Sequence, residues 1–178
     1  KVPIVTGAVL FDLAVGDYRI RPDKAMGYRA CRNASVNECL QGNVGAGTGA
    51  TVGKLKGQDY ATKGGLGCFA LQVGDLKVGA VIAVNCFGDV IDPRTGEILA
   101  GMLTEDRKKF AETERIMAQQ YRTSENIFSG NTTIGVVATN ARLNKSQATK
   151  IASIAHNGFA RTIRPAHTMA DGDTIFTL

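Results

Sequence analysis

Glycine is concentrated in one part of this chain, and this concentration constrains the fold more than any other feature. The 178 residues include 21 glycines, and 9 of them fall within residues 42–67. Only 4 prolines accompany them and the segment is not repetitive, so its composition differs from that of a flexible linker. Such glycines are typical of tight turns, of backbone that approaches a ligand closely, or of tightly packed layers.

The overall composition is that of a globular protein. Hydrophobic residues make up 44% and charged residues 21%, which excludes a disordered chain. No apolar run approaches the ~18 residues that a membrane span requires, because glycine or a polar residue interrupts every candidate. Neither a repeat nor a change in composition marks a boundary. We therefore expect one domain over residues 1–178 and no membrane partner.

The net charge of +5 raises the question of nucleic-acid binding. A nucleic-acid-binding surface gathers Lys and Arg and interleaves them with aromatic residues. Here the basic residues are spread from Lys1 to Arg164 and mix with acidic ones, as in residues 104–109 (TEDRKK). This distribution favours a solvated surface, and we expect no nucleic-acid partner.

The cysteines form no C-x-x-C pair, so they give no support to a metal or redox site. They are Cys31, Cys39, Cys68 and Cys86. The last two lie in apolar runs, where cysteine usually behaves as a small buried hydrophobic residue. We therefore expect a reducing compartment, the cytoplasm. No secretory signal pattern is present, and the abrupt start and end indicate a fragment of a longer protein.

Apolar periodicity and turn signals predict strands and helices that alternate along the chain. Strands are expected at residues 2–13, 66–73, 78–86, 133–139 and 174–178, and helices at residues 21–33, 104–121 and 144–163. Thr104 is expected to cap the second helix. Ile151, Ile154 and Phe159 are expected to face the core from the third helix. This mixture predicts the α/β or α+β class.

Residues 42–57 (GNVGAGTGATVGKLKG) invite comparison with a phosphate-binding loop. They do not match the P-loop motif, because Leu55 follows Lys54 where that motif requires Ser or Thr. A dinucleotide fingerprint is also disfavoured, since the residues after Gly49 look extended rather than helical. The glycines favour backbone that approaches a site into which Lys54 projects. A glycine-bent strand with a surface lysine is the simpler alternative.

Residues 129–133 (SGNTT) contain a candidate self-cleavage site. A Thr or Ser hydroxyl can attack the preceding carbonyl and form an ester, which water then opens. The new N-terminal residue carries an α-amine with a pKa of about 8, which can act as base for its own hydroxyl. The same residues match a glycosylation sequon, as do those beginning at Asn33 and Asn144, so the motif is weak by itself.

Two acidic residues, Asp171 and Asp173, flank Gly172 near the end of the chain. On extended backbone their carboxylates point to the same side, where they can hold an ammonium group or orient a base. Asp-Gly is also a common turn dipeptide, which is the competing interpretation.

His156 and His167 lack a partnered Cys or Ser motif. Both are expected to be ordinary surface or core residues, and no metal site is expected.

Five segments occur together and in order, and the resemblance they carry covers nearly the whole chain. They are residues 3–17 (PIVTGAVLFDLAVGD), 42–57, 78–92 (VGAVIAVNCFGDVID), 130–143 (GNTTIGVVATNARL) and 163–176 (IRPAHTMADGDTIF). Together they resemble the L-aminopeptidase/D-amino-acid esterase family, which includes β-aminopeptidases and nylon-oligomer hydrolases. Each segment alone is weak, but the combination is specific.

The resemblance implies a precursor that cleaves itself into a large α part and a small β part. The match to GNTT places the cut between Asn131 and Thr132, giving residues 1–131 and 132–178, with Thr132 as the nucleophile. The resemblance also assigns Lys54 to the active site, where its charge keeps the α-amine of Thr132 neutral and basic. Asn85 matches an asparagine that stabilises the oxyanion.

Asp171 and Asp173 match a polar pair near the nucleophile, and one of them is expected to hold the free amine of the substrate. Aspartate at both positions looks closer to the nylon-oligomer hydrolases than to the β-aminopeptidases. Phe11 stands where relatives often carry Tyr, so this chain lacks a hydroxyl at that position. Family members also extend beyond both ends of this chain.

The resemblance implies an α/β fold, a four-layer αββα sandwich of two sheets covered by helices. It also implies hydrolysis of N-terminal residues from small peptides, amino-acid amides or esters, through an acyl-enzyme and without cofactor or metal. The αβ units are expected to form a homo-oligomer. Two rival hypotheses are a non-catalytic module that binds a phosphorylated small molecule through residues 42–57, and a relative whose processing site is unused.

Overall fold

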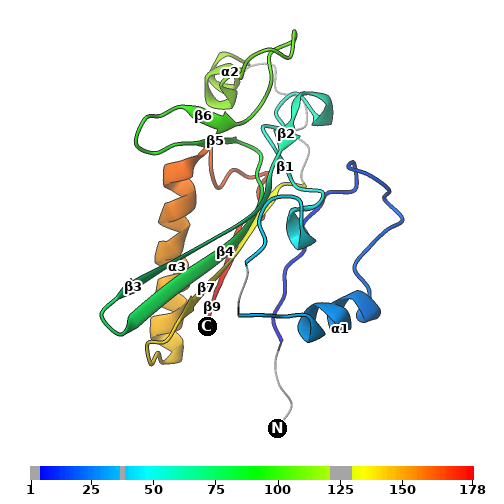
Figure 1. Cartoon of the computed structure of the whole chain (residues 1–178). Coiled ribbons are helices and arrows are strands. Elements are labelled where there is room, and N and C mark those ends of the chain that lie inside the picture. The colour runs from blue at the N-terminus through cyan, green and yellow to red at the C-terminus, as the bar shows by residue number, and fades with distance from the viewer. Residues whose placement is uncertain (1–4, 37–38, 121–129) are drawn as a thin grey trace.

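The computed structural model describes residues 5–36, 39–120 and 130–178 (Figure 1). Its helices are α1 (Lys24–Arg32), α2 (Thr113–Gln120) and α3 (Lys145–Thr162), with short 3-10 helices η1 (Gly45–Gly47) and η2 (Gln58–Tyr60). Its strands are β1 (Thr51–Val52), β2 (Thr62–Lys63), β3 (Gly65–Val73), β4 (Leu76–Asn85), β5 (Asp89–Ile91), β6 (Ile98–Ala100), β7 (Thr132–Thr139), β8 (Ile163–Arg164) and β9 (Thr174–Thr177).

The main sheet has the strand order β3-β4-β7-β9. β3 and β4 form a long antiparallel hairpin that turns at Gly74, where a φ of 57° favours glycine. β7 pairs antiparallel with β4, and β9 pairs parallel with β7. The strands expected at residues 66–73 and 78–86 are confirmed as β3 and β4. Just before β7 and β9, Asn131 and Asp171 form a parallel bridge, which brings two predicted site segments side by side.

The core lies between α3 and the main sheet, and Figure 1 shows the helix running along one face of that sheet. Phe159 of α3 packs in one buried cluster with Val137 of β7 and Ile175 of β9. Gly135 leaves room for the side chain of its cross-strand neighbour, because a Cβ at this position would lie only 2.7 Å from Ile82 Cδ1. The same Cβ would lie 3.6 Å from Phe159 Cζ of α3, which is ordinary van der Waals contact.

A smaller sheet, β6-β5-β8, is tied to α2 by the buried Asp89. Its carboxylate accepts hydrogen bonds from Met102 N (2.8 Å), Thr113 N (2.6 Å) and Thr113 Oγ1 (2.7 Å). A buried charge requires such partners, because it has lost its hydration. Asp89 therefore fixes the start of α2.

The helix expected at residues 104–121 is wrong over its first half. Thr104 Oγ1 lies 2.5 Å from Asp106 Oδ1 in a turn and does not cap a helix. Glu112 has a φ of 52°, outside the helical region, so α2 begins only at Thr113. Tyr121, the last residue of the expected helix, lies outside the described residues, as does Ser129 of the SGNTT motif.

The strand expected at residues 2–13 is also wrong over residues 5–13, which join no sheet among the described parts of the chain. Residues 2–4 lie outside the described ranges. The expected third helix is confirmed as α3, which Asn144 and Gln147 begin with a reciprocal capping box. Ile154, however, is 48% exposed and does not face the core.

Cys39 and Cys68 form a disulfide, so Cys68 is not the ordinary buried thiol that was expected. The cytoplasmic location stays a prediction. Cys86 is buried as expected, and burial raises the pKa of its thiol far above the usual range.

Among the described residues, no helix is both long enough and apolar enough to cross a membrane.

Candidate active site

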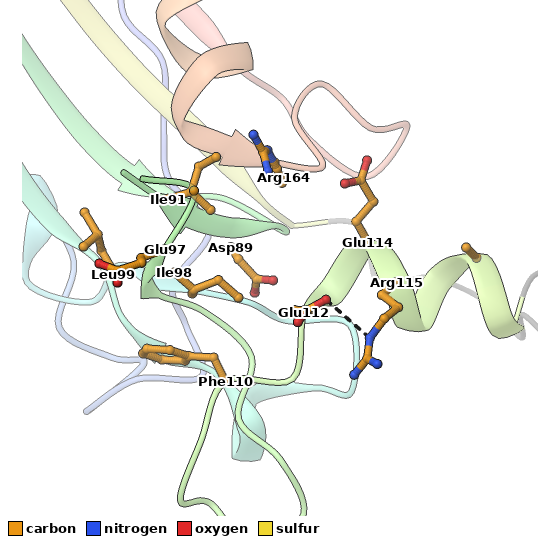
Figure 2. Close-up of a pocket in the computed structure, with 12 residues that line it drawn as sticks. Asp89, Ile91, Glu97, Ile98, Leu99, Phe110, Glu112, Glu114, Arg115 and Arg164 are labelled. Carbon is orange, nitrogen blue, oxygen red and sulfur yellow. Dashed lines mark ion pairs between the residues drawn. The ribbon is translucent and has the colours of Figure 1, made fainter. Parts of the chain in front are cut away.

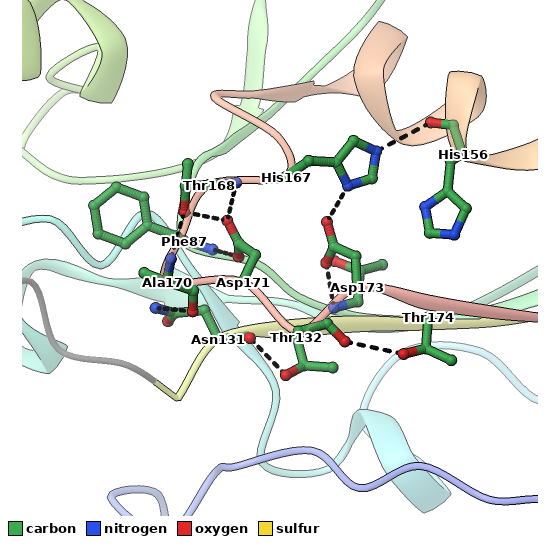
Figure 3. A network of polar contacts seen from close by, with 12 residues as sticks. Phe87, Asn131, Thr132, His156, His167, Thr168, Ala170, Asp171, Asp173 and Thr174 are labelled. Atoms are coloured by element: carbon green, nitrogen blue, oxygen red, sulfur yellow. Dashed lines mark hydrogen bonds and ion pairs between the residues drawn. The ribbon is translucent and has the colours of Figure 1, made fainter. Parts of the chain in front are cut away.

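The peptide bond between Asn131 and Thr132 lies at the start of β7, in the middle of a polar network (Figure 3). The hydroxyl of Thr132 contacts the carbonyl oxygen of Asn131 at 2.5 Å. The same oxygen accepts a hydrogen bond from the backbone N–H of Gly172 at 2.8 Å. The carbonyl that self-cleavage would attack thus accepts from two donors, the Gly172 N–H and the hydroxyl of the candidate nucleophile itself.

Glycine at position 172 makes this close approach easier. A Cβ on Gly172 would lie 3.1 Å from Thr132 Oγ1, which is tighter than ordinary van der Waals contact. The Asp-Gly-Asp motif therefore does more than form a turn, since its central glycine lets one backbone segment cross against the candidate nucleophile.

Asp173 holds the other side of this peptide segment. Its carboxylate accepts a hydrogen bond from Thr133 N at 2.8 Å and lies 2.8 Å from His167 Nδ1, and the side chain is only 4% exposed. A charge-assisted bond of this kind is stronger than a neutral one. Asp173 consequently fixes the backbone of the residue that follows Thr132.

His167 is a site residue that the sequence analysis missed, because it was expected to be an ordinary residue. Besides its ion pair with Asp173, its ring lies 5.0 Å from the ring of His156 and 6.1 Å from that of Phe159. Its φ of 54° is unusual for a side chain with a Cβ, and such backbone strain gathers at functional sites. Burial and the neighbouring His167 lower the pKa of His156.

Asp171 positions the loop that precedes β9. One carboxylate oxygen accepts from Phe87 N at 3.0 Å, and the other accepts from Thr168 N (3.2 Å) and Thr168 Oγ1 (2.7 Å). Both oxygens are thus engaged by the protein itself, as they are in Asp173. These contacts favour a positioning role for the pair over the expected role in holding a substrate amine, which stays untested.

Lys54 and Asn85 meet on the other side of the site. Lys54 Nζ donates to the Asn85 backbone oxygen at 3.0 Å and to Oδ1 at 2.8 Å. Asn85 lies opposite Thr132 in the β4–β7 pair, and its Nδ2 donates to the carbonyl of Phe11 at 3.2 Å. The structure therefore brings Lys54, Asn85 and the Thr132 strand together. The Asn85 amide nitrogen carries a second N–H besides the one that donates to Phe11, and this second N–H is the candidate donor to an oxyanion.

Burial lowers the pKa of Lys54 to about 8, because the ammonium loses hydration. Nearby Cys86, Asp171 and Asp12 act in the opposite direction. Because this pKa lies above 7, most Lys54 side chains are protonated near neutral pH. The positive charge of the ammonium disfavours protonation of any amine beside it. The site can therefore keep a neighbouring α-amine in its basic form.

The glycine-rich segment places Lys54 through its backbone. Gly53 has a φ of 72°, and a Cβ there would coincide with the backbone of Met102. The N–H groups of Gly53 and Lys54 donate to the carbonyls of Gly88 and Phe87. These N–H groups do not form a phosphate cradle, so the phosphate-binding alternative gains no support.

Two cavities lie in the described parts of the chain near charged side chains. One, of about 330 Å³, is lined by Phe11, Asp12, Ala14, Lys54, Gly57, Gln58 and Gly130, and so adjoins the site. Figure 2 shows the other, of about 860 Å³, which is lined by Arg164 of β8, Arg115 of α2 and Glu112 just before α2, together with residues of β5 and β6. None of the predicted site residues lines the larger cavity.

The described residues contain no cluster of three or more His, Cys, Asp or Glu that could hold a metal ion.

Comparison with known proteins places this arrangement in a family. The family model described as peptidase family S58 matches residues 1–178. An uncharacterized aminopeptidase of Mycobacterium leprae is 43% identical over 99% of this chain and 49% of its own length. A 6-aminohexanoate-oligomer endohydrolase of Paenarthrobacter ureafaciens is 31% identical over the whole chain and 50% of its own length. The chain thus spans about half the length of these relatives.

Solved structures support the fold. An L-aminopeptidase D-Ala-esterase/amidase from Ochrobactrum anthropi, described as a variant of the Ntn-hydrolase fold, matches 86% of this chain and 36% of its own. Its TM-score is 0.54 at 20% identity. The PH0078 protein of Pyrococcus horikoshii matches the same shares with a TM-score of 0.53 at 21% identity. The predicted α/β sandwich agrees with this fold, and by its family match the chain belongs to peptidase family S58.

Proposed function

We propose that this chain is part of an amide hydrolase that cleaves itself between Asn131 and Thr132 and then uses Thr132 as an N-terminal nucleophile. The observation that carries the proposal is the Asn131 carbonyl oxygen, which contacts the Thr132 hydroxyl and accepts the Gly172 N–H. Membership of a peptidase family and relatives named aminopeptidase and oligomer endohydrolase support the same reaction class.

Self-cleavage begins with attack of Thr132 Oγ1 on the carbonyl carbon of Asn131. The Gly172 N–H stabilises the negative charge that develops on the oxygen. The C–N bond then breaks, and the proton lost by the hydroxyl ends on the nitrogen of Thr132. The resulting ester is hydrolysed by water, which leaves a carboxylate on Asn131 and a free α-amine on Thr132.

In turnover, the α-amine of Thr132 takes the proton of its own hydroxyl while the oxygen attacks the substrate carbonyl. The Lys54 ammonium disfavours protonation of that amine, and Asp173 holds the backbone of Thr133 in place. Asn85 stabilises the oxyanion through the second N–H of its side-chain amide, since the first donates to the Phe11 carbonyl. An acyl-enzyme forms, the amine leaves, and water releases the acid.

Small peptides, amino-acid amides or amino-acid esters are the proposed substrates, and no cofactor takes part in these steps. The sequence is more similar to the Mycobacterium leprae aminopeptidase, at 43% identity, than to the 31% identical endohydrolase. Placement in the nylon-oligomer branch therefore stays a prediction. So does the homo-oligomer of αβ units, for which Phe69, Leu71 and Val73 of β3 offer an exposed apolar surface.

Hydrolysis of amino-acid p-nitroanilides by matched threonine variants tests the proposal. Thr132→Ala removes the nucleophile and is expected to abolish release of nitroaniline. Thr133→Val is the control, because the buried Thr133 hydroxyl has no hydrogen-bond partner among the described residues and valine has the same shape. Normal activity in Thr132→Ala would contradict the proposed mechanism.

A further inference from the structure

The smaller cavity has the position of a substrate pocket. It extends from Lys54 to Gly130, which is two residues before the candidate nucleophile, and its volume is about 330 Å³. Phe11 and Ala14 contribute apolar walls, and Gly57 and Gln58 complete the lining on the side of η2. A pocket of this size holds a group of a few carbon atoms beside the reacting bond.

Asp12 is the one acidic residue among the described residues that line this pocket. It is partly buried, and no hydrogen bond or ion pair to its carboxylate is found within the described ranges. The pKa values of Lys54 and Lys63 both respond to its charge. Its carboxylate can therefore accept hydrogen bonds from a cation that enters the pocket.

The two neighbouring lysines do not supply that cation directly. Lys54 directs its ammonium to both oxygens of Asn85. Lys63 donates to the backbone carbonyls of Gly47, Thr48 and Ala50, at distances of 3.2, 2.9 and 2.7 Å. Their ammonium groups are thus held by neutral oxygens, and the carboxylate of Asp12 remains available to a ligand.

The surrounding backbone is shaped around Asp12. A Cβ on Gly49 would coincide with the Asp12 carboxylate, so glycine at that position leaves the space that the carboxylate fills. The carbonyl of the preceding residue, Phe11, accepts the Asn85 amide, which ties the segment to the active site. The space at Gly49 and the hydrogen bond to the Phe11 carbonyl therefore hold Asp12 close to the active site.

We propose that Asp12 is the specificity-determining residue that binds the protonated primary amine of the substrate. This inference rests on the proposed function, and it gives the role first expected of Asp171 or Asp173 to a carboxylate that other groups do not occupy. An ammonium group presents up to three donors to one carboxylate, and such charge-assisted bonds select amines over neutral groups of the same shape.

Calorimetry with n-hexylamine and 1-hexanol tests the proposal without hydrolysis, because neither probe has an acyl group. The unaltered protein is expected to bind hexylamine at least about tenfold more tightly than hexanol. Asp12→Asn is expected to remove this preference and leave hexanol binding unchanged. Gly49→Ala is expected to weaken the preference as well, since its methyl group displaces the carboxylate.

Asp59→Asn is the matched control, because it removes the same charge from an exposed residue next to the pocket-lining Gln58. It is expected to keep the preference for hexylamine. Equal binding of both probes by the unaltered protein, or a preference that survives in Asp12→Asn, would overturn the proposal.

Kinetics separates this inference from the proposed function. Asp12→Asn is expected to raise KM at least about tenfold for p-nitroanilides with a free amine, and to leave N-acetylated ones unchanged. An equal loss on both substrates would show that Asp12 acts through Lys54 and would overturn the inference. Selective amine binding by a protein without any hydrolase activity would refute the proposed function and leave the role of Asp12 standing.

Discussion

The backbone N–H of Gly172 donates a hydrogen bond to the carbonyl oxygen of Asn131 over 2.8 Å. This contact joins the loop before β9 to the start of β7, because Asn131 and Gly172 are 41 residues apart in the chain but lie next to the Asn131–Asp171 bridge. It places a fixed donor on the oxygen that becomes negative during self-cleavage. The proposed self-cleavage therefore depends on the geometry of position 172.

Gly172→Ala is expected to slow self-cleavage by about tenfold or more, because its Cβ would lie 3.1 Å from Thr132 Oγ1 and disturb both the donor and the nucleophile. The time course of precursor loss on denaturing gels measures this rate. Gly67→Ala is the control, since a Cβ at Gly67 meets no atom within 4 Å. Equal cleavage rates in the two variants would contradict the role given to Gly172.

Asp173 and His167 are expected to act as a pair. Asp173→Asn and His167→Gln should each reduce kcat, and the double variant should lose less than the sum, with a coupling energy of about 1 kcal/mol. The reason is that each substitution alone already breaks the 2.8 Å ion pair that holds Thr133 N through Asp173. A double-mutant cycle on kcat measures the coupling, and strictly additive losses would argue against it.

The buried Lys54 predicts a pH dependence of stability. Its pKa is about 8 in the folded chain and 10.5 when unperturbed, so the unfolded state binds more protons between these values. The free energy of unfolding should therefore rise with pH in that window, by about 1–2 kcal/mol between pH 8 and 9.5. Urea unfolding of the protein and of Lys54→Met checks this, since the variant should lack the rise.

Gly53→Ala is expected to destabilise the fold by about 2 kcal/mol or more, because alanine tolerates a φ of 72° poorly and its Cβ would coincide with the Met102 backbone. Gly27→Ala in α1 is the opposite control, since a Cβ there meets no atom within 4 Å and alanine favours a helix. Denaturant midpoints compare the two, and a stable Gly53→Ala would show that position 53 tolerates a side chain.

Sequence patterns predicted the elements whose signals are local. The strands expected at residues 66–73 and 78–86 and the helix expected at residues 144–163 are all found in the structure. Residues next to these elements define their ends, Gly74 in a turn and Asn144 in a capping box. The patterns failed where a distant partner decides the outcome. Residues 104–112 carry helix-forming side chains, but Glu112 has a positive φ and Asp89 fixes the start of α2 at Thr113.

The same contrast holds for the site. The resemblance named Thr132, Lys54 and Asn85, and the structure brings these three together. It did not name the Gly172 N–H, because a backbone donor has no signature in a sequence. The pairing of His167 with Asp173 was also missed, since it depends on how the loop before β9 folds back on α3.

The N-terminal sequence of the purified protein after incubation tests the central claim most directly. We predict a second chain that begins at Thr132, with the sequence Thr-Thr-Ile-Gly-Val in the unaltered protein and Thr-Val-Ile-Gly-Val in Thr133→Val. This chain should be absent from Thr132→Ala. A single intact chain after prolonged incubation, or a cut at any other bond, would contradict the account.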